Sequence, residues 1–135
     1  MVAMNRKSMT QPNPLDIVNN LTAAINRGDL DAAVDLYEQD AVLVVQPGKI
    51  ARGRSAIREA LAGFISLKPT LRGQAQQIVD RDDIVLHCSR WILTGTSPDG
   101  KKVEMGGVSS DILQRQSDGS WLIAIDNPWG TTIVS

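Results

Sequence analysis

The chain has 135 residues, of which 42% are hydrophobic, and its 14 Lys and Arg against 15 Asp and Glu give a formal net charge of −1. This length and apolar content are typical of one globular domain. The balanced charge lacks the basic stripe that nucleic-acid binding needs, so we expect no nucleic-acid partner. The single cysteine, Cys88, excludes an internal disulfide and a cysteine-rich zinc site, and it is typical of a cytoplasmic protein.

Residues 1–12 contain Arg6 and Lys7 but no apolar run after them. We therefore expect a flexible N-terminal arm and no secretory signal. No apolar stretch approaches the roughly 20 residues of a membrane-spanning helix, so we expect no membrane partner. Residues 13–135 are predicted to form a single domain.

The first two predicted elements are helices. In NPLDIVNNLTAAINRG, apolar residues recur at helical spacing, which predicts a helix that Asn13 caps, Pro14 opens and Gly28 ends. Asp29 is placed to cap a second helix over LDAAVDLYEQ.

A strand and a third helix are expected next. The β-branched run AVLVV predicts a strand buried on both faces, which Pro47 and Gly48 close. In RGRSAIREALAGFISLKP, the apolar spacing predicts a helix that Ser55 caps and that Pro69 prevents from continuing.

From Thr70 onward the helical period disappears and turn signals recur at residues 80–83, 97–101 and 117–120. This pattern predicts four strands of an antiparallel meander. Two of the strands are long, which indicates a strongly bent sheet, and Gly106 and Gly107 mark a place for the bend. Helices segregated to one side of such a sheet predict an α+β domain with a hollow interior.

Three segments together resemble the nuclear transport factor 2-like (NTF2-like) superfamily, and within it the ketosteroid-isomerase-like and SnoaL-like members. They are NRGDLDAAVDLYEQDAVLVVQPG, ARGRSAIREAL and DGSWLIAIDNPWG, and the resemblance covers residues 14–130. It implies a cone-shaped, cystatin-like fold in which three helices cover the concave side of a strongly curved antiparallel or mixed sheet. It also implies a mostly apolar pocket and a homodimer. The fold hosts isomerases, dehydratases, hydrolases and proteins without known chemistry, so it does not assign a function.

The resemblance can be tested against the polar groups of a steroid-isomerase-like site. The tyrosine of such a site falls on Leu21, and its base falls on Val45 or Gln46, none of which can take the expected role. Only its acid has a counterpart, Asp111. This departure argues against that reaction, because proton transfer needs a base within reach.

Asp111 and Asp126 are the candidate catalytic carboxyls. Each lies in an apolar strand context, where a carboxylate must be paired or change its pKa. Two such acids on neighbouring strands would form an acid–base pair. The alternative for Asp126 is a surface position, capping a strand or pairing with an arginine (Arg52, Arg54 or Arg90).

His87 is the only histidine and the third catalytic candidate, as an auxiliary proton carrier. Strand alternation places His87 on one face with Ser89 and Trp91, whereas Cys88 points to the other face, which argues against a Cys–His dyad. The alternative is a hydrogen-bonded structural histidine. We expect no metal site, because a second histidine or a thiolate cluster is missing and the acids at 80–83 lack calcium-loop spacing.

Trp91, Trp129 and Tyr37 are the candidate ligand-binding residues. Tryptophan offers a flat apolar surface on which an organic ligand can stack, whereas Trp121, at the start of an apolar strand, is expected in the core. Pro128 ends the last strand, so that Trp129 crosses the cavity mouth or enters a dimer contact. Tyr37 is expected at the end of the second helix, lining the pocket floor or packed on the sheet.

Three functions remain open. The first is a small-molecule pocket protein acting as an isomerase, dehydratase or hydrolase on an apolar or aromatic metabolite, without a cofactor. The second is a non-catalytic ligand-binding module. The third is a dimeric interaction module that uses the outer sheet face. The sequence leaves open whether the protein is an enzyme, and whether it is a homodimer or a monomer.

Overall fold

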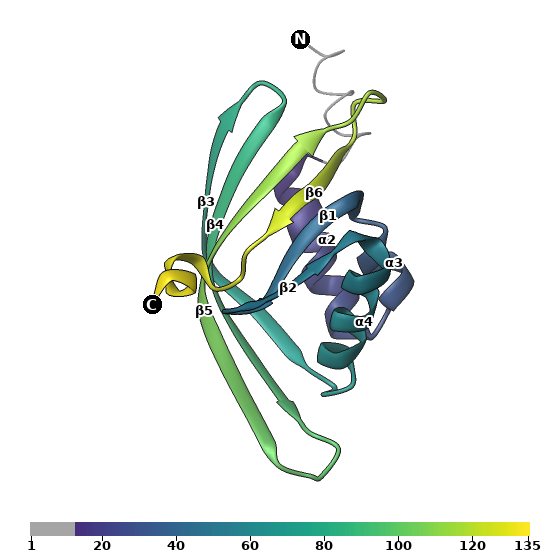
Figure 1. The fold of residues 1–135 in the computed structure, drawn as a ribbon, viewed down its shortest axis with the longest axis vertical. Helices are drawn as coiled ribbons and strands as arrows, with labels where there is room; N and C mark the ends of the chain where they lie inside the picture. Colours follow the sequence, from purple (N-terminus) through teal and green to yellow (C-terminus); the bar gives the residue numbers. More distant parts are fainter. Residues whose placement is uncertain (1–12) are drawn as a thin grey trace.

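The structure is a computed structural model that describes residues 13–135, so the arm predicted over residues 1–12 lies outside the described residues. In the described part, three α-helices cover one face of a six-stranded mixed sheet, and the C-terminal 3-10 helix lies on the other side of the sheet (Figure 1). The helices are α2 (Pro14–Arg27), α3 (Leu30–Val34), α4 (Gly53–Ile65) and the 3-10 helix η1 (Gly130–Val134). The strands are β1 (Tyr37–Gln46), β2 (Lys49–Arg52), β3 (Thr70–Arg81), β4 (Ile84–Thr96), β5 (Lys102–Arg115) and β6 (Trp121–Asp126).

The first helix begins and ends where its sequence predicts. The Asn13 side chain accepts from the backbone N–H of Asp16, and the Asp16 carboxylate accepts in turn from the Asn13 N–H. This reciprocal capping box satisfies two N–H groups that the helix cannot pair internally. Gly28 ends the helix in the left-handed conformation, with φ of 74°.

Two local predictions are wrong, and one strand has no counterpart among the predicted elements. The second helix does not reach Tyr37: it ends at Val34, because Tyr37 is taken into β1 and pairs with Ile123 of β6. Ser55 does not cap α4, which begins at Gly53 without a side-chain cap. In addition, a strand, β2, was not anticipated between Pro47–Gly48 and α4; it folds back on β1 as a hairpin.

The antiparallel meander from residue 70 onward is confirmed. The sheet order is β2-β1-β6-β5-β4-β3, in which β3, β4, β5 and β6 are antiparallel neighbours. Strand β1 pairs in parallel with β6, which makes the sheet mixed. Strands β4 and β5 are 13 and 14 residues long and curve around the helices, and the sheet does not close into a barrel (Figure 1).

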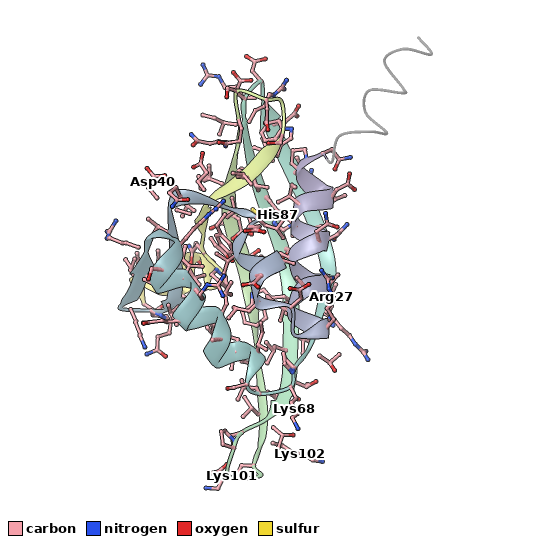
Figure 2. The ribbon with its side chains drawn as sticks, turned by 90° about the vertical axis from the view of Figure 1, so that its right-hand side faces the viewer. Arg27, Asp40, Lys68, His87, Lys101 and Lys102 are labelled. Atoms are coloured by element: carbon pink, nitrogen blue, oxygen red, sulfur yellow. The ribbon has the colours of Figure 1, made fainter. Side chains whose placement is uncertain are left out.

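The core lies between the helices and the concave face of the sheet. Its fully buried side chains include Tyr37, Ile57, Leu113 and Ile123, and Trp121 is also buried there, as predicted. Figure 2 shows charged side chains such as Asp40 on the outside of the molecule and His87 in the interior. Within residues 13–135, no helix is both long and apolar enough to cross a membrane.

Candidate active site

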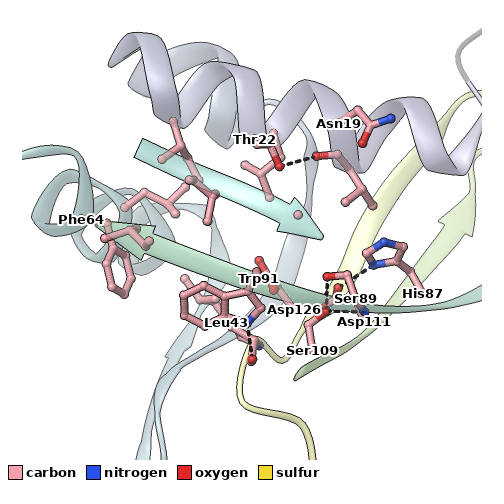
Figure 3. A pocket seen from close by; sticks show the side chains of 18 of the residues that line it. Asn19, Thr22, Leu43, Phe64, His87, Ser89, Trp91, Ser109, Asp111 and Asp126 are labelled. Carbon is pink, nitrogen blue, oxygen red and sulfur yellow. Dashed lines mark hydrogen bonds and ion pairs between the residues drawn. The ribbon is translucent and has the colours of Figure 1, made fainter. Parts of the chain in front are cut away.

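A cavity of about 330 Å³ opens between α2, α4 and the concave face of the sheet (Figure 3). Most of its lining is apolar, and Leu21 is part of it. Other apolar lining residues are Val18, Ile25, Leu43, Leu61, Phe64 and Leu93. The ionisable groups of the lining are Tyr37, His87, Asp111 and Asp126, all four predicted from the sequence as site residues.

Asp111 and His87 lie opposite each other on β5 and β4 and form a buried pair. His87 Nδ1 lies 2.9 Å from Asp111 Oδ2, and the exposed fractions of the two residues are 1% and 7%. The other oxygen of Asp111, Oδ1, accepts from the backbone N–H of Asn127 at 2.9 Å. The carboxyl of Asp111 is therefore held at both oxygens and kept at the cavity wall.

Asp126 faces the cavity and not the surface. Its Oδ2 accepts from the Tyr37 hydroxyl at 2.5 Å, and no arginine pairs with it among the described residues, so the alternative of a surface ion pair is wrong. The reason is the parallel pairing of β6 with β1, which sets Asp126 opposite Leu43, another cavity residue. Arg54 instead donates to the backbone carbonyl of Tyr37, at 2.6 and 2.8 Å.

Burial makes Asp126 a weak acid. Loss of water, followed by the neighbouring charge of Asp111, raises its pKa well above the ordinary value of 3.8, although the hydrogen bond from Tyr37 works in the opposite direction. Burial and the nearby Asp126 also raise the pKa of Tyr37 well above 10.0, so its hydroxyl stays a neutral donor. Two carboxyls in one site cannot both ionise easily, and here the pKa of Asp126 is the one that the environment raises.

Trp91 and Trp129 form an aromatic wall beside the polar groups. Their ring centroids are 5.4 Å apart in an edge-to-face arrangement. Trp91 Nε1 donates to the carbonyl of Pro128, and Trp129 Nε1 donates to the carbonyl of Val45, at 2.7 and 3.0 Å. Because both N–H groups are already used, the two tryptophans offer a ligand apolar ring surface only.

Tyr37 lies in the cavity lining and is packed against the sheet. Tyr37 is fully buried at the start of β1, and its hydroxyl is engaged by Asp126. Its ring is therefore packed in the core, and its contribution to the cavity is the hydroxyl end.

Three further polar contributions were not singled out from the sequence. Ser89 and Ser109 share a hydrogen bond of 2.9 Å between their hydroxyls in the cavity wall. Asn127 positions Asp111, and its side-chain amide donates to Gly130 at 3.1 Å. Gln76 contacts His87. Strand alternation from His87 leads to Ser89, but no sequence signal ties Asn127 or Gln76 to the site.

Within residues 13–135, no three His, Cys, Asp or Glu side chains lie close enough together to bind a metal ion. Cys88 is half-buried on the face of β4 opposite His87. The polar groups that remain for chemistry at the cavity are a carboxyl with a raised pKa, a second carboxyl with a histidine partner, and a tyrosine hydroxyl.

Solved structures share this fold with the chain. One is an NTF2-like protein with a cystatin-like fold from Novosphingobium aromaticivorans (TM-score 0.73, 14% identity, 93% of this chain and 84% of that chain). Another, from the same organism, is provisionally named a scytalone dehydratase (TM-score 0.76, 15% identity, 93% and 85%). A third, from Shewanella frigidimarina, is provisionally named a ketosteroid isomerase (TM-score 0.69, 20% identity, 82% and 90%). These structural similarities show that the chain has an NTF2-like fold.

The family of the protein is assigned from its sequence. The SnoaL-like domain family matches residues 18–122, which is well over half of the chain. The protein therefore belongs to the SnoaL-like family of the NTF2-like superfamily. No curated protein matches it in sequence.

Proposed function

We propose that the protein is an acid–base enzyme that moves a proton on a small, largely apolar or aromatic molecule, as an isomerase or dehydratase does. The observation that carries this proposal is the pair of unlike carboxyls at one end of an apolar cavity. Asp126, with its raised pKa, is the general acid, and Asp111, held by His87 and Asn127, is the general base. His87 is the auxiliary proton carrier.

The chemistry follows from the positions of the two groups. A substrate with a carbonyl oxygen near Asp126 and Tyr37 has the adjacent carbon within the part of the cavity that Asp111 lines. Asp111 takes a proton from that carbon, the electron pair of the broken C–H bond forms a C=C bond, and the π pair of the carbonyl moves to the oxygen. Asp126 donates a hydrogen bond or its proton to this oxygen, where charge develops. The reverse step returns a proton to carbon.

The lining of the cavity supports an apolar ligand with its polar atom at one end. The aromatic wall of Trp91 and Trp129 suits a flat ring, and the remaining helix-side lining carries few polar groups. A cavity of about 330 Å³ has room for a molecule of one or two fused rings.

The test uses 2-tetralone, a bicyclic ketone with exchangeable protons beside its carbonyl. In heavy water, we expect the protein to speed deuterium uptake at these carbons above the buffer rate, as followed by proton NMR. The Asp126→Asn variant keeps the shape of the side chain but cannot deliver a proton. Its rate of deuterium uptake is expected to be at least tenfold lower than that of the wild type. Equal rates with protein and with buffer alone would count against the proposal.

A non-catalytic binding module is the second candidate, and one observation favours it. Both ring nitrogens of His87 are already occupied, by Asp111 and Gln76, and no buried side-chain polar atom among the described residues lacks a partner. A site whose polar groups already have hydrogen-bond partners within the protein is suited to holding a ligand without reacting with it. Saturable quenching of tryptophan fluorescence by 2-tetralone, without deuterium uptake, would support this candidate.

We also propose that the protein forms a homodimer through the outer face of the sheet. Val79, Ile84, Val108 and Ile125, on four different strands, are between 43% and 58% exposed there, opposite the helices. Large apolar side chains exposed on one sheet face are costly to leave in water. By sedimentation, we expect a dimer for the wild type and a monomer for Val108→Glu, which places a charge near the middle of this face. A wild-type monomer, or a dimer unaffected by the substitution, would contradict this proposal.

A further inference from the structure

Gln76 lies on β3, at the edge of the sheet, yet its side chain reaches the interior. The residue is exposed, but its Oε1 lies 2.9 Å from Nε2 of His87, which is only 1% exposed. Gln76 is also part of the cavity lining. This contact is the second partner of the histidine, on the side of the ring opposite Asp111.

An irregularity in β3 turns Gln76 inward. Gly73 pairs with Trp91, but Ala75 pairs with Arg90, so one extra residue, Gln74, is accommodated between them. Trp91 lines the cavity, and without the extra residue the strand would alternate from Gly73 to bring position 75 inward and position 76 outward. The bulge reverses this order. Bulges often re-aim a side chain beside a functional site.

The amide of Gln76 is oriented by a second contact. Its Nε2 lies 3.4 Å from Oδ1 of Asn19 on α2, an oxygen that can only accept. The Oε1 of Gln76 is thereby left to face the histidine, and an amide oxygen also can only accept. Nε2 of His87 must therefore carry a proton. Nδ1 faces an oxygen of Asp111, so a second proton lies between Nδ1 and that carboxyl.

We propose that Gln76 is a positioning residue that fixes a proton of His87 on Nε2, in addition to the proton that Nδ1 shares with Asp111. The proposal rests on the proposed function for its catalytic consequence, but not for the protonation it assigns. In a dyad without such an acceptor, a neutral histidine beside a carboxylate carries its proton on Nδ1 and leaves Nε2 bare. Gln76 disfavours that form, because it would set two lone pairs against each other.

The test reads the ring nitrogens of His87 directly. His87 is the only histidine, so its ring signals in a nitrogen-15 NMR spectrum need no assignment to a residue, and only Nε2 has to be told apart from Nδ1. At neutral pH, we expect a protonated Nε2 in the wild type. Gln76→Leu removes the acceptor and is expected to shift Nε2 toward the unprotonated form, whereas Gln76→Glu keeps an acceptor and is expected to restore the protonated signal.

The matched control is Gln77→Leu, on the neighbouring residue. Gln77 pairs with Cys88 and lies on the opposite face of β3, and its amide contacts only the backbone carbonyl of Ile78. This variant is expected to leave the His87 spectrum unchanged. Thermal unfolding of all variants shows whether a change in the His87 spectrum results only from unfolding of the variant.

The catalytic consequence is measured with 2-tetralone. Gln76→Leu is expected to lower deuterium uptake by about tenfold, the equivalent of one hydrogen bond, and Gln76→Glu to recover most of the rate. An unprotonated Nε2 in the wild type, or the same spectrum in the wild type and Gln76→Leu, would overturn the proposal. If the wild type shows the predicted spectrum but no deuterium uptake, the proposed function fails while the role of Gln76 in fixing the proton stands.

Discussion

We expect the Asp111→Asn variant to catalyse deuterium uptake into 2-tetralone about 10²-fold to 10⁴-fold more slowly than the wild type. This is the range that a positioned general base contributes to a rate. Asparagine keeps the size of the side chain and an oxygen for the Asn127 N–H, but it cannot accept a proton from carbon. Ligand affinity, measured by quenching of tryptophan fluorescence, is expected to change much less, because the apolar wall is unaltered.

The control for this variant is Asp40→Asn, which removes an exposed carboxylate from β1, away from the cavity lining. Its rate should match that of the wild type. If Asp111→Asn retained a rate within twofold of the wild type, Asp111 would not be the base, and the assignment of the two carboxyls would have to be abandoned.

The second large effect is on stability as a function of pH. Because burial raises the pKa of Asp126 well above 3.8, the folded protein keeps a proton that the unfolded chain releases. The stabilisation from this proton is fully present below about pH 3.9 and is lost as pH rises toward the raised pKa, by up to about 1.4 kcal/mol per pH unit.

Asp126→Asn isolates this contribution. Its amide has no proton to lose, its oxygen can accept from Tyr37, and its NH₂ can donate toward Asp111, so it resembles the protonated acid. Urea unfolding from acid to neutral pH is therefore expected to show the wild type losing stability relative to Asp126→Asn as pH rises. A difference that stays flat, or that grows in favour of the wild type, would mean that Asp126 is ionised in the folded protein.

Local sequence signals predicted much of this fold. The cap at Asn13, the stop at Gly28 and the three hairpin turns are short-range features whose residues decide their own conformation. Alternation along β4 likewise placed His87, Ser89 and Trp91 together on the cavity side. These predictions succeed because they depend on neighbours in the chain.

The features that were predicted wrongly or not at all depend on contacts between segments that are distant in the sequence. Helical spacing continues through Tyr37, but its pairing with β6 and its hydrogen bond to Asp126, 89 residues away, draw it into a strand. Intrinsic helix propensity is small enough for such burial to override it. The inward turn of Gln76 has a similar origin, because the bulge between Gly73 and Ala75 is defined by the register with β4, and Gly73 alone does not predict it.

The most direct test of this account is the protonation of Asp126 in the folded protein at neutral pH. Infrared difference spectroscopy of the wild type against Asp126→Asn reports the C=O stretch of a neutral carboxylic acid separately from that of a carboxylate. We predict a carboxylic acid band in the wild type that is absent from the variant. A carboxylate band in its place would show that Asp126 has no proton to donate, and the acid–base pair proposed for this cavity would not exist.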